Sequence, residues 1–311
     1  MTATQGSAPG ISVVIPTRGR RELVRKAVQA VVDQRYDGAI ECVVVHDQEE
    51  PDETLEQLSR ADRRVSVCFN KGQTGLAGSR NFGLDQVEHD LIASCDDDDW
   101  WEPGKVRAQV TRLGQNPDMI VVGAGIRLLM AEDRVVEWLG SSDIVTQEDL
   151  FRSRRKELHS STLMMRRAAF ELAGTYDEKL PQGYAEDYEW LLRASQHGSL
   201  GVVRAPLANI KKDGQSWFRE RSEVIAEALE YLLAQHPEIK TSRRGHARIL
   251  GQIAFARANL GERREALSLI EKSLLRWPLA PQAGLALFQV TFRSDPRVLL
   301  RGARVVGRGL S

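Results

Sequence analysis

Short, almost entirely apolar runs recur near the start of the chain and alternate with segments of helical periodicity. Continuous hydrophobicity of this kind is typical of strands buried on both faces of a parallel sheet. Strands that alternate with helices predict an α/β fold, a mostly parallel sheet flanked by helices. The stretch Ile126–Gly140 has the pattern of a hairpin, so we expect the sheet to be mixed. The apolar runs are Ile11–Pro16, Ile40–Val45, Val65–Phe69, Leu91–Cys95 and Met119–Gly125.

The pattern changes after Trp217, where helical periodicity continues to the end of the sequence without a further strand. Within this part, Leu250–Pro278 has small residues where two helices would cross and Gly261 between them, a spacing similar to one tetratricopeptide-like hairpin. We therefore expect a disordered N-terminus at residues 1–10, an α/β domain at 11–216 and an all-α C-terminal region at 217–311.

Charge and composition exclude several classes of protein. Because 43 basic side chains balance 43 acidic ones, bulk attraction to nucleic acid is not expected. The opening MTATQGSAPG lacks the order of a signal peptide, and no apolar run approaches the roughly 20 residues that span a bilayer, so we expect a cytoplasmic protein. Cys42, Cys68 and Cys95 fall inside predicted strands and are expected to be free thiols.

A run of four carboxylates, Asp96–Asp99, follows the apolar strand Leu91–Cys95 directly. One or two of them could simply cap the helix that Pro103 introduces. Four adjacent like charges repel one another by ~1 kcal/mol per pair at 4 Å even in water. A hard divalent cation relieves that repulsion, and open α/β sheets bind ligands at the carboxyl ends of their strands. The run therefore predicts a Mg²⁺ or Mn²⁺ site that holds a substrate diphosphate.

A second acidic pair, Glu186–Asp187, begins an amphipathic helix. Acidic residues in a first helical turn commonly complement the helix dipole, which stabilises the helix by ~0.3–1 kcal/mol. A carboxylate in this place also suits a general base, so both interpretations stay open on the residues alone.

Taken together, these segments resemble family 2 glycosyltransferases, which have the GT-A fold, over roughly residues 10–220. The resemblance is carried by VVIPTRGR (13–20), VVVHDQ (43–48), NKGQTGLAGSRNFGL (70–84), the DDDD run and EDYEW (186–190). It implies an inverting enzyme that moves a sugar from a nucleotide-diphosphate donor, most often a UDP-sugar, to an acceptor hydroxyl of a glycan or lipid-linked glycan. The sequence departs from the family pattern at His46 and Gln48.

The resemblance also implies roles for individual residues. Asp98 and Asp96 would hold the metal, and Asp187, next to Glu186, would be the catalytic base. Trp100, Trp101, His159 and Ser160 would lie on the acceptor side. A core position for one tryptophan and a purely structural role for His159 and Ser160 are equally compatible with the sequence. The donor-binding residues would be Pro16, Thr17, Arg18, Asp47, Asn70, Gly75, Arg80, Asp96, Asp97, Lys212 and Ser216, with Lys211 as a further phosphate contact. For Lys211, Lys212 and Ser216, a solvated basic loop is equally compatible with the sequence.

Other functions remain open on the residues alone. A nucleotidyltransferase also uses acidic metal ligands, but PTRGR (16–20) is short and poor in glycine for such an enzyme. A receiver-type acidic pocket fits a chain of about half this length. A catalytically degenerate nucleotide-binding or helical scaffold protein is a further alternative. The intact DDDD and Glu-Asp motifs argue against it, and a loss of nucleotide binding would favour the scaffold.

The C-terminal tail is basic and apolar. Arg293, Arg297, Arg301, Arg304 and Arg308 outnumber Asp295 and alternate with valine and leucine. This composition is compatible with peripheral contact with an anionic membrane at its inner face, or with a solvated helix end packed on the core.

Overall fold

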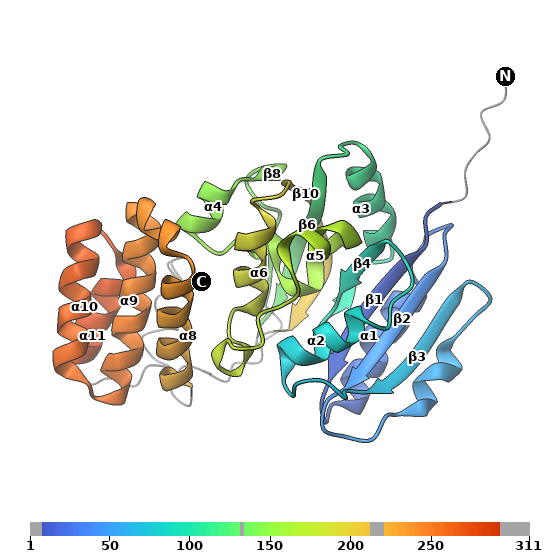
Figure 1. Ribbon diagram of the computed structural model, residues 1–311, viewed down its shortest axis with the longest axis horizontal. Helices are drawn as coiled ribbons and strands as arrows, with labels where there is room; N and C mark the ends of the chain where they lie inside the picture. Colours follow the sequence, from blue (N-terminus) through green and yellow to red (C-terminus); the bar gives the residue numbers. More distant parts are fainter. Residues whose placement is uncertain (1–7, 131–133, 212–220, 293–311) are drawn as a thin grey trace. The chain divides into compact units, whose positions relative to one another are not determined.

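The computed structural model describes residues 8–130, 134–211 and 221–292 (Figure 1). The predicted contacts Lys212 and Ser216, and the basic tail from Arg293, lie outside the described residues. Backbone contacts divide the chain into two compact units. Unit 1 comprises Met1–Thr146, Arg155–Glu178 and Glu186–Asp213, and unit 2 comprises Gln147–Arg154, Lys179–Ala185 and Gly214–Ser311.

The strands are β1 (Ile11–Thr17), β2 (Ile40–His46), β3 (Arg63–Phe69), β4 (Leu91–Ser94), β5 (Trp100–Trp101), β6 (Met119–Leu129), β7 (Val135–Trp138), β8 (Ile144–Val145), β9 (Met164–Arg166) and β10 (Ser199–Lys211). The α-helices are α1 (Arg21–Val32), α2 (Leu76–Leu84), α3 (Lys105–Gly114), α4 (Gln147–Arg152), α5 (Arg167–Ala173), α6 (Glu186–Ala194), α8 (Ser222–Gln235), α9 (Arg243–Leu260), α10 (Arg263–Arg276) and α11 (Pro281–Phe292). Short 3₁₀ helices lie at Glu53–Leu58, Lys156–Leu158, Ser160–Thr162, Pro181–Gly183 and Pro237–Thr241.

One mixed sheet organises unit 1, in the strand order β3-β2-β1-β4-β9-β6-β10-β5. β1, β2, β3 and β4 pair in parallel, whereas β9 is antiparallel to both β4 and β6. β7 pairs antiparallel with β6, with Ile126 opposite Trp138, which confirms the predicted hairpin. The expectation of an α/β fold with a mostly parallel, mixed sheet is therefore confirmed.

Two glycines allow β6 to run unbroken into this hairpin. A Cβ on Gly123 would lie 2.1 Å from the backbone oxygen of Glu157, and one on Gly125 would lie 2.7 Å from that of Ala205. Only glycine permits such close approach of neighbouring backbone. As a result, the predicted fifth strand and the first arm of the predicted hairpin form one continuous strand.

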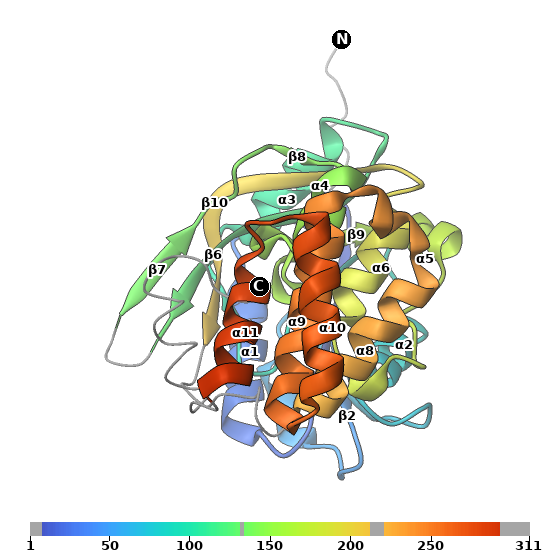
Figure 2. The same ribbon diagram turned by 90° about the vertical axis from the view of Figure 1, so that its left-hand side faces the viewer.

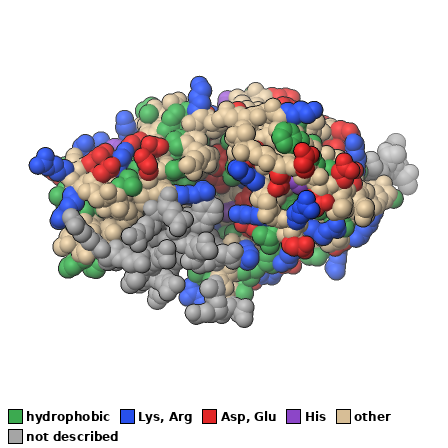
Figure 3. Space-filling model, turned by 90° about the horizontal axis from the view of Figure 1, so that it is seen from below, with side chains coloured by type: hydrophobic (Ala, Val, Ile, Leu, Met, Phe, Trp, Pro, Cys, Tyr) green, Lys and Arg blue, Asp and Glu red, His purple; other side chains and the backbone are tan. Residues whose placement is uncertain are grey.

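The main core lies against the sheet and is built from the apolar strand runs and the inner face of α1, including Ile11, Ile15, Val28 and Val44. The three cysteines are free thiols, as expected, with Cys42 and Cys95 buried and Cys68 partly buried. Figure 3 shows basic and acidic side chains interspersed over one face of the molecule, in keeping with the formal net charge of zero.

The helices α9, α10 and α11 of unit 2 pack on one another (Figure 2). Gly261, in the left-handed region with φ +86°, ends α9 and turns the chain into α10, as the sequence predicts for this glycine. A Cβ on Gly251 would lie 2.8 Å from the backbone nitrogen of Ala283, so this glycine lets α9 and α11 approach closely. Within the described residues 221–292 there are helices and no strand, and no described helix is long and apolar enough to cross a membrane.

Candidate functional site

The four aspartates form a turn between β4 and β5. β4 lies beside β1, which lies beside β2, all in parallel, so the turn shares the carboxyl edge of the sheet with Thr17 and His46. This is the edge at which open α/β sheets bind ligands. The structure thus brings the predicted VVIPTRGR, VVVHDQ and DDDD segments to one place.

Asp97 and Asp98 face the loop after β1. The Thr17 hydroxyl donates to Asp97 over 2.8 Å, and Arg20 Nη1 lies 2.9 Å from one oxygen of each aspartate. The Asp98 side chain, at 34% exposure, is the most exposed of the four. Arg20 is a contact that the sequence interpretation did not single out, although it lies within the VVIPTRGR segment.

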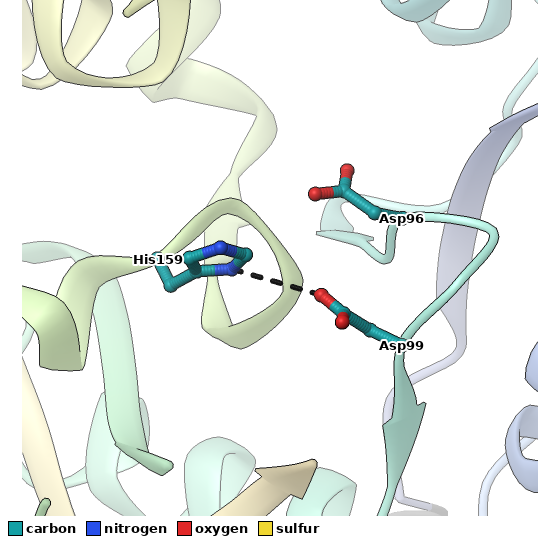
Figure 4. Close-up of side chains that lie close together, drawn as sticks. All are labelled: Asp96, Asp99 and His159. Carbon is teal, nitrogen blue, oxygen red and sulfur yellow. Dashed lines mark ion pairs between the residues drawn. The ribbon is translucent and has the colours of Figure 1, made fainter. Parts of the chain in front are cut away.

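Asp96 and Asp99 face the segment that follows the 3₁₀ helix at Lys156–Leu158 (Figure 4). The Ser160 hydroxyl donates to Asp96 over 2.7 Å, and the Ser161 hydroxyl donates to Asp99 over 2.5 Å. His159 Nδ1 points toward Asp99 at 3.8 Å. One ligand atom each from Asp96, Asp99 and His159 lie within 4.8 Å of one another, a spacing that suits a metal ion.

The ionisation of the four aspartates is unequal. Burial raises the pKa of Asp97, Asp98 and Asp99, and the negative charge of Asp96 adds to the rise at Asp98 and Asp99. Burial also opposes ionisation of Asp96, but the positive charges of Arg80 and His159 prevail and lower its pKa. Together the aspartates and the imidazole offer oxygen and nitrogen ligands around an excess of negative charge, so they fit a divalent cation such as Mg²⁺ or Mn²⁺.

Arg80, on α2, links the acidic turn to the Glu-Asp pair. Its guanidinium is 1% exposed, lies 2.6 Å from Asp96 and forms an ion pair with Glu186. The ring of Tyr176 lies 5.6 Å from the guanidinium carbon. The sequence predicts that Arg80 binds the donor; in the structure its buried side chain joins two motifs about ninety residues apart in the chain.

Asp187 begins α6 together with Glu186, and both side chains are almost fully buried. One oxygen of Asp187 accepts the backbone N–H of Tyr188 over 2.7 Å. Burial raises the pKa of Glu186 to about 7, opposed by Arg80 and assisted by the nearby charges of Asp187 and Asp96. Glu186 therefore serves as the partner of Arg80, and Asp187 is the second carboxylate of the pair.

Asp47 organises the loop after β3. Its two oxygens accept the side-chain amide of Asn70 over 3.1 Å and the backbone N–H of Gly75 over 3.1 Å. Asn70 also donates to the carbonyl of Gln73. A Cβ on Gly78 would overlap that same carbonyl, so the small residues at the start of α2 let the helix close on this loop.

The other predicted contacts have different environments. Pro16 is buried in β1 and Arg18 is exposed after it. Trp101 lies in the main core and is 3% exposed. Trp100 is partly exposed, and Lys26 Nζ lies 3.0 Å from the centre of its ring. The backbone N–H of Lys211 donates to Asp99 over 3.2 Å.

A buried lysine lies below the acidic turn. Lys105 is fully buried, its Nζ lies 3.8 Å from the ring centre of Trp101, and this amine has no hydrogen-bond partner within the described residues. Burial lowers the pKa of Lys105 to about 7. The ordinary lysine pKa is well above this, so folding releases a proton from Lys105 at intermediate pH.

We expect this lysine to make unfolding depend on pH. Between about pH 7 and pH 10 the unfolded chain binds more protons than the folded one, so stability rises with pH, by ~1 kcal/mol for each pH unit. Lys105→Met should remove this rise and should be more stable than wild type at pH 7. Urea unfolding at pH 7.5 and pH 9 measures the effect, with exposed Lys71→Met as the control; parallel pH profiles for wild type and Lys105→Met would contradict it.

The chain is similar in sequence to several known proteins. The model of the family "Glycosyl transferase family 2" matches residues 12–171, about half of the chain. An uncharacterised glycosyltransferase of Haemophilus influenzae is 24% identical over 222 residues, which are 67% of each chain. A Campylobacter jejuni GalNAc(5)-diNAcBac-PP-undecaprenol beta-1,3-glucosyltransferase is 32% identical over 95 residues, 29% of this chain and 30% of that protein. The chain thus spans from under a third to two thirds of these relatives.

Two solved structures have the same fold. The S. aureus TarS 1-349 complex with UDP-GlcNAc aligns with a TM-score of 0.60 and 18% identity over 96% of this chain and 92% of that one. The Pyrobaculum calidifontis mannosyltransferase PcManGT, in complex with GDP-Man and Mn²⁺, aligns with a TM-score of 0.55 and 13% identity over 92% and 88%. With a GT-A fold and a family model that covers residues 12–171, this chain belongs to glycosyl transferase family 2.

Proposed function

We propose that the chain is an inverting hexosyltransferase, acting in the cytoplasm, that moves a sugar from a UDP-sugar to a hydroxyl of a glycan or lipid-linked glycan. The observation that carries the proposal is the double ion pair of Arg80 with Asp96 and Glu186. It ties the acidic turn, which suits the donor diphosphate, to the pair that contains a candidate base. A helix start or a solvated acidic turn would not require this link.

The donor half of the proposal rests on the acidic turn. Asp96, Asp99 and His159, which bring one ligand atom each within 4.8 Å of one another, would hold Mn²⁺ or Mg²⁺, with Asp98 as the further ligand that the sequence predicts. Asp97 would face the donor beside Thr17. A bound cation would supply positive charge that neutralises the donor diphosphate. The fold match to a protein crystallised with UDP-GlcNAc, and to one crystallised with GDP-Man and Mn²⁺, supports a nucleotide-sugar and leaves the base to be measured.

The acceptor half rests on Asp187. In a single displacement, the acceptor oxygen forms a bond to the anomeric carbon as the bond to the diphosphate oxygen breaks, and the hydroxyl proton passes to the Asp187 carboxylate. The nucleoside diphosphate leaves from the opposite face, so the configuration inverts, as in inverting glycosidases. Glu186 and Arg80 would hold Asp187 in place through α6. The C. jejuni relative, whose name describes transfer to an undecaprenol-linked glycan, supports an acceptor of that class.

The test is calorimetric titration of the full chain with UDP, dTDP and GDP, each with Mn²⁺ and with excess chelator. We expect one nucleotide to bind, and only with metal. The nucleotide that binds with metal determines which sugar donors are used in a transfer assay. In that assay, NMR of the product should show an anomeric configuration inverted relative to the donor.

A further inference from the structure

Trp138, the last residue of β7, is an exposed tryptophan held in a fixed orientation. β7 lies beside β6 at the edge of the sheet (Figure 2), and Trp138 is 41% exposed. Its indole Nε1–H donates to the carboxylate of Glu157 over 2.8 Å, although Glu157 itself is only 1% exposed. Because a buried carboxylate is costly unless it is hydrogen-bonded, this contact satisfies Glu157 and fixes the indole ring at the same time.

Two further contacts restrict the indole ring. Lys156 Nζ lies over the ring, 4.6 Å from its centre. Gly140, with φ +77°, turns the chain just after β7, and a Cβ there would lie 3.3 Å from side-chain atoms of Glu157. A ring that is immobilised before binding loses little conformational entropy when a ligand stacks on it, so Trp138 suits a stacking platform.

The residues that hold Trp138 are connected to the acidic turn in two ways. Two residues after Glu157 comes His159, whose ligand atom lies close to those of the acidic turn. Arg127 on β6 provides the second connection. Its guanidinium contacts Glu137 on β7 over 2.9 Å and Glu102, directly after β5, over 2.6 Å. The exposed ring and the candidate metal site therefore belong to one connected part of unit 1.

The strand register gives the separation between Trp138 and the acidic turn. Trp138 pairs with Ile126 on β6, and Ile126 pairs with Ala208 on β10. Ala208 pairs in turn with Trp101, two residues after the last aspartate of the turn. Three strand spacings thus separate the two tryptophans, which is ~14 Å at the usual spacing of neighbouring strands. A single sugar at the acidic turn would not reach Trp138, whereas a chain of several sugars would.

We propose that Trp138 is a stacking platform for a sugar ring of the acceptor glycan, remote from the hydroxyl that receives the new sugar. The apolar face of a pyranose packs on the indole, and the Lys156 ammonium can donate to sugar hydroxyls. A protein partner fits this surface less well, because Lys156, Glu137 and Arg127 place charges next to the ring, and the centres of protein interfaces are depleted of charge. The inference rests on the proposed transfer to a glycan and adds that the acceptor is an oligosaccharide.

Direct binding of glycans by the full chain tests the proposal. Hexose and N-acetylhexosamine oligosaccharides, each with its monosaccharide, are screened on an array, and the bound ones are titrated by calorimetry. We expect wild type to bind at least one oligosaccharide ~10-fold or more tightly than its monosaccharide, and Trp138→Ala to lose that preference. Trp138→Phe keeps an aromatic ring and should stay within ~3-fold of wild type. Val135→Ala is the matched control and should bind like wild type, because Val135 is 51% exposed on β7 and lies on the other face of the strand.

The proposal is overturned if wild type binds no oligosaccharide, or if Trp138→Ala keeps the preference for the longer glycan. Equal losses of affinity in Trp138→Phe and Trp138→Ala, with a lower Tm in both, would give Trp138 a structural role through Glu157 instead. Light scattering that shows a dimer for wild type and a monomer for Trp138→Ala would assign β7 to a contact between two copies. If the proposed function itself fails, wild type binds no nucleotide, whereas failure of this inference alone leaves metal-dependent nucleotide binding intact.

Discussion

Asp187→Asn should abolish most transfer while leaving donor binding intact. An amide cannot accept the acceptor proton, and removal of a positioned general base typically costs ~10²–10⁴-fold in turnover. The substitution is nearly isosteric, and the amide oxygen can still accept the N–H of Tyr188. We therefore expect kcat to fall by that factor and the Kd for the nucleotide to change by less than ~3-fold.

Release of nucleoside diphosphate from the selected donor, with water or methanol as the minimal acceptor, measures the effect. Glu189→Gln is the control on the same helix, because Glu189 forms its ion pair with Arg193, away from Arg80. Equal turnover in Asp187→Asn and Glu189→Gln would show that the base lies elsewhere.

Arg80→Met should destabilise the protein more than any surface charge deletion. It leaves Asp96 and the buried Glu186 without their shared cation, and loss of one partner of a buried ion pair typically costs ~3–5 kcal/mol. Without Arg80, both carboxylates should have folded-state pKa values above those of the unfolded chain. The stability of the variant should therefore be highest at low pH and fall as pH rises through those folded-state values.

Urea unfolding at pH 5 and pH 8 tests this sign. Arg64→Met is the control, because Arg64 is 63% exposed and its ion pair with Glu88 should contribute at most ~1 kcal/mol. Arg80→Lys should be intermediate, since an ammonium keeps the charge but lacks the fork that reaches two carboxylates. Equal losses of unfolding free energy in Arg80→Met and Arg64→Met would show that the buried ion pairs of Arg80 do not stabilise the site.

The sheet was largely predictable because the apolar runs are continuous. The runs at residues 11–16, 40–45 and 65–69 became β1, β2 and β3 with ends within a few residues. β10 was not predicted, because Arg204 and Pro206 interrupt its hydrophobic pattern. In the structure, the register between β10 and β6 shifts on either side of Pro206.

The chemistry of the site was predictable as residue types but not as contacts. Because residues 96–99 are identical, the sequence does not show which aspartate takes which role. Their separate roles are set by side chains from elsewhere in the chain: Thr17 and Arg20 on one side, Ser160 and Ser161 on the other. The ion pairs that join Arg80 to Asp96 and Glu186 likewise depend on how α2, the acidic turn and α6 pack together. A local sequence pattern does not contain that information.

The most direct test of the account is the metal dependence of nucleotide binding at the acidic turn. Calorimetric titration of UDP, dTDP and GDP into wild type, Asp98→Ala and Arg64→Met, with Mn²⁺ and with chelator, measures it. The account predicts binding to wild type and to Arg64→Met that requires Mn²⁺, and loss of that binding in Asp98→Ala. Binding that survives both the chelator and Asp98→Ala, or no binding of UDP, dTDP or GDP by the wild type, would contradict it.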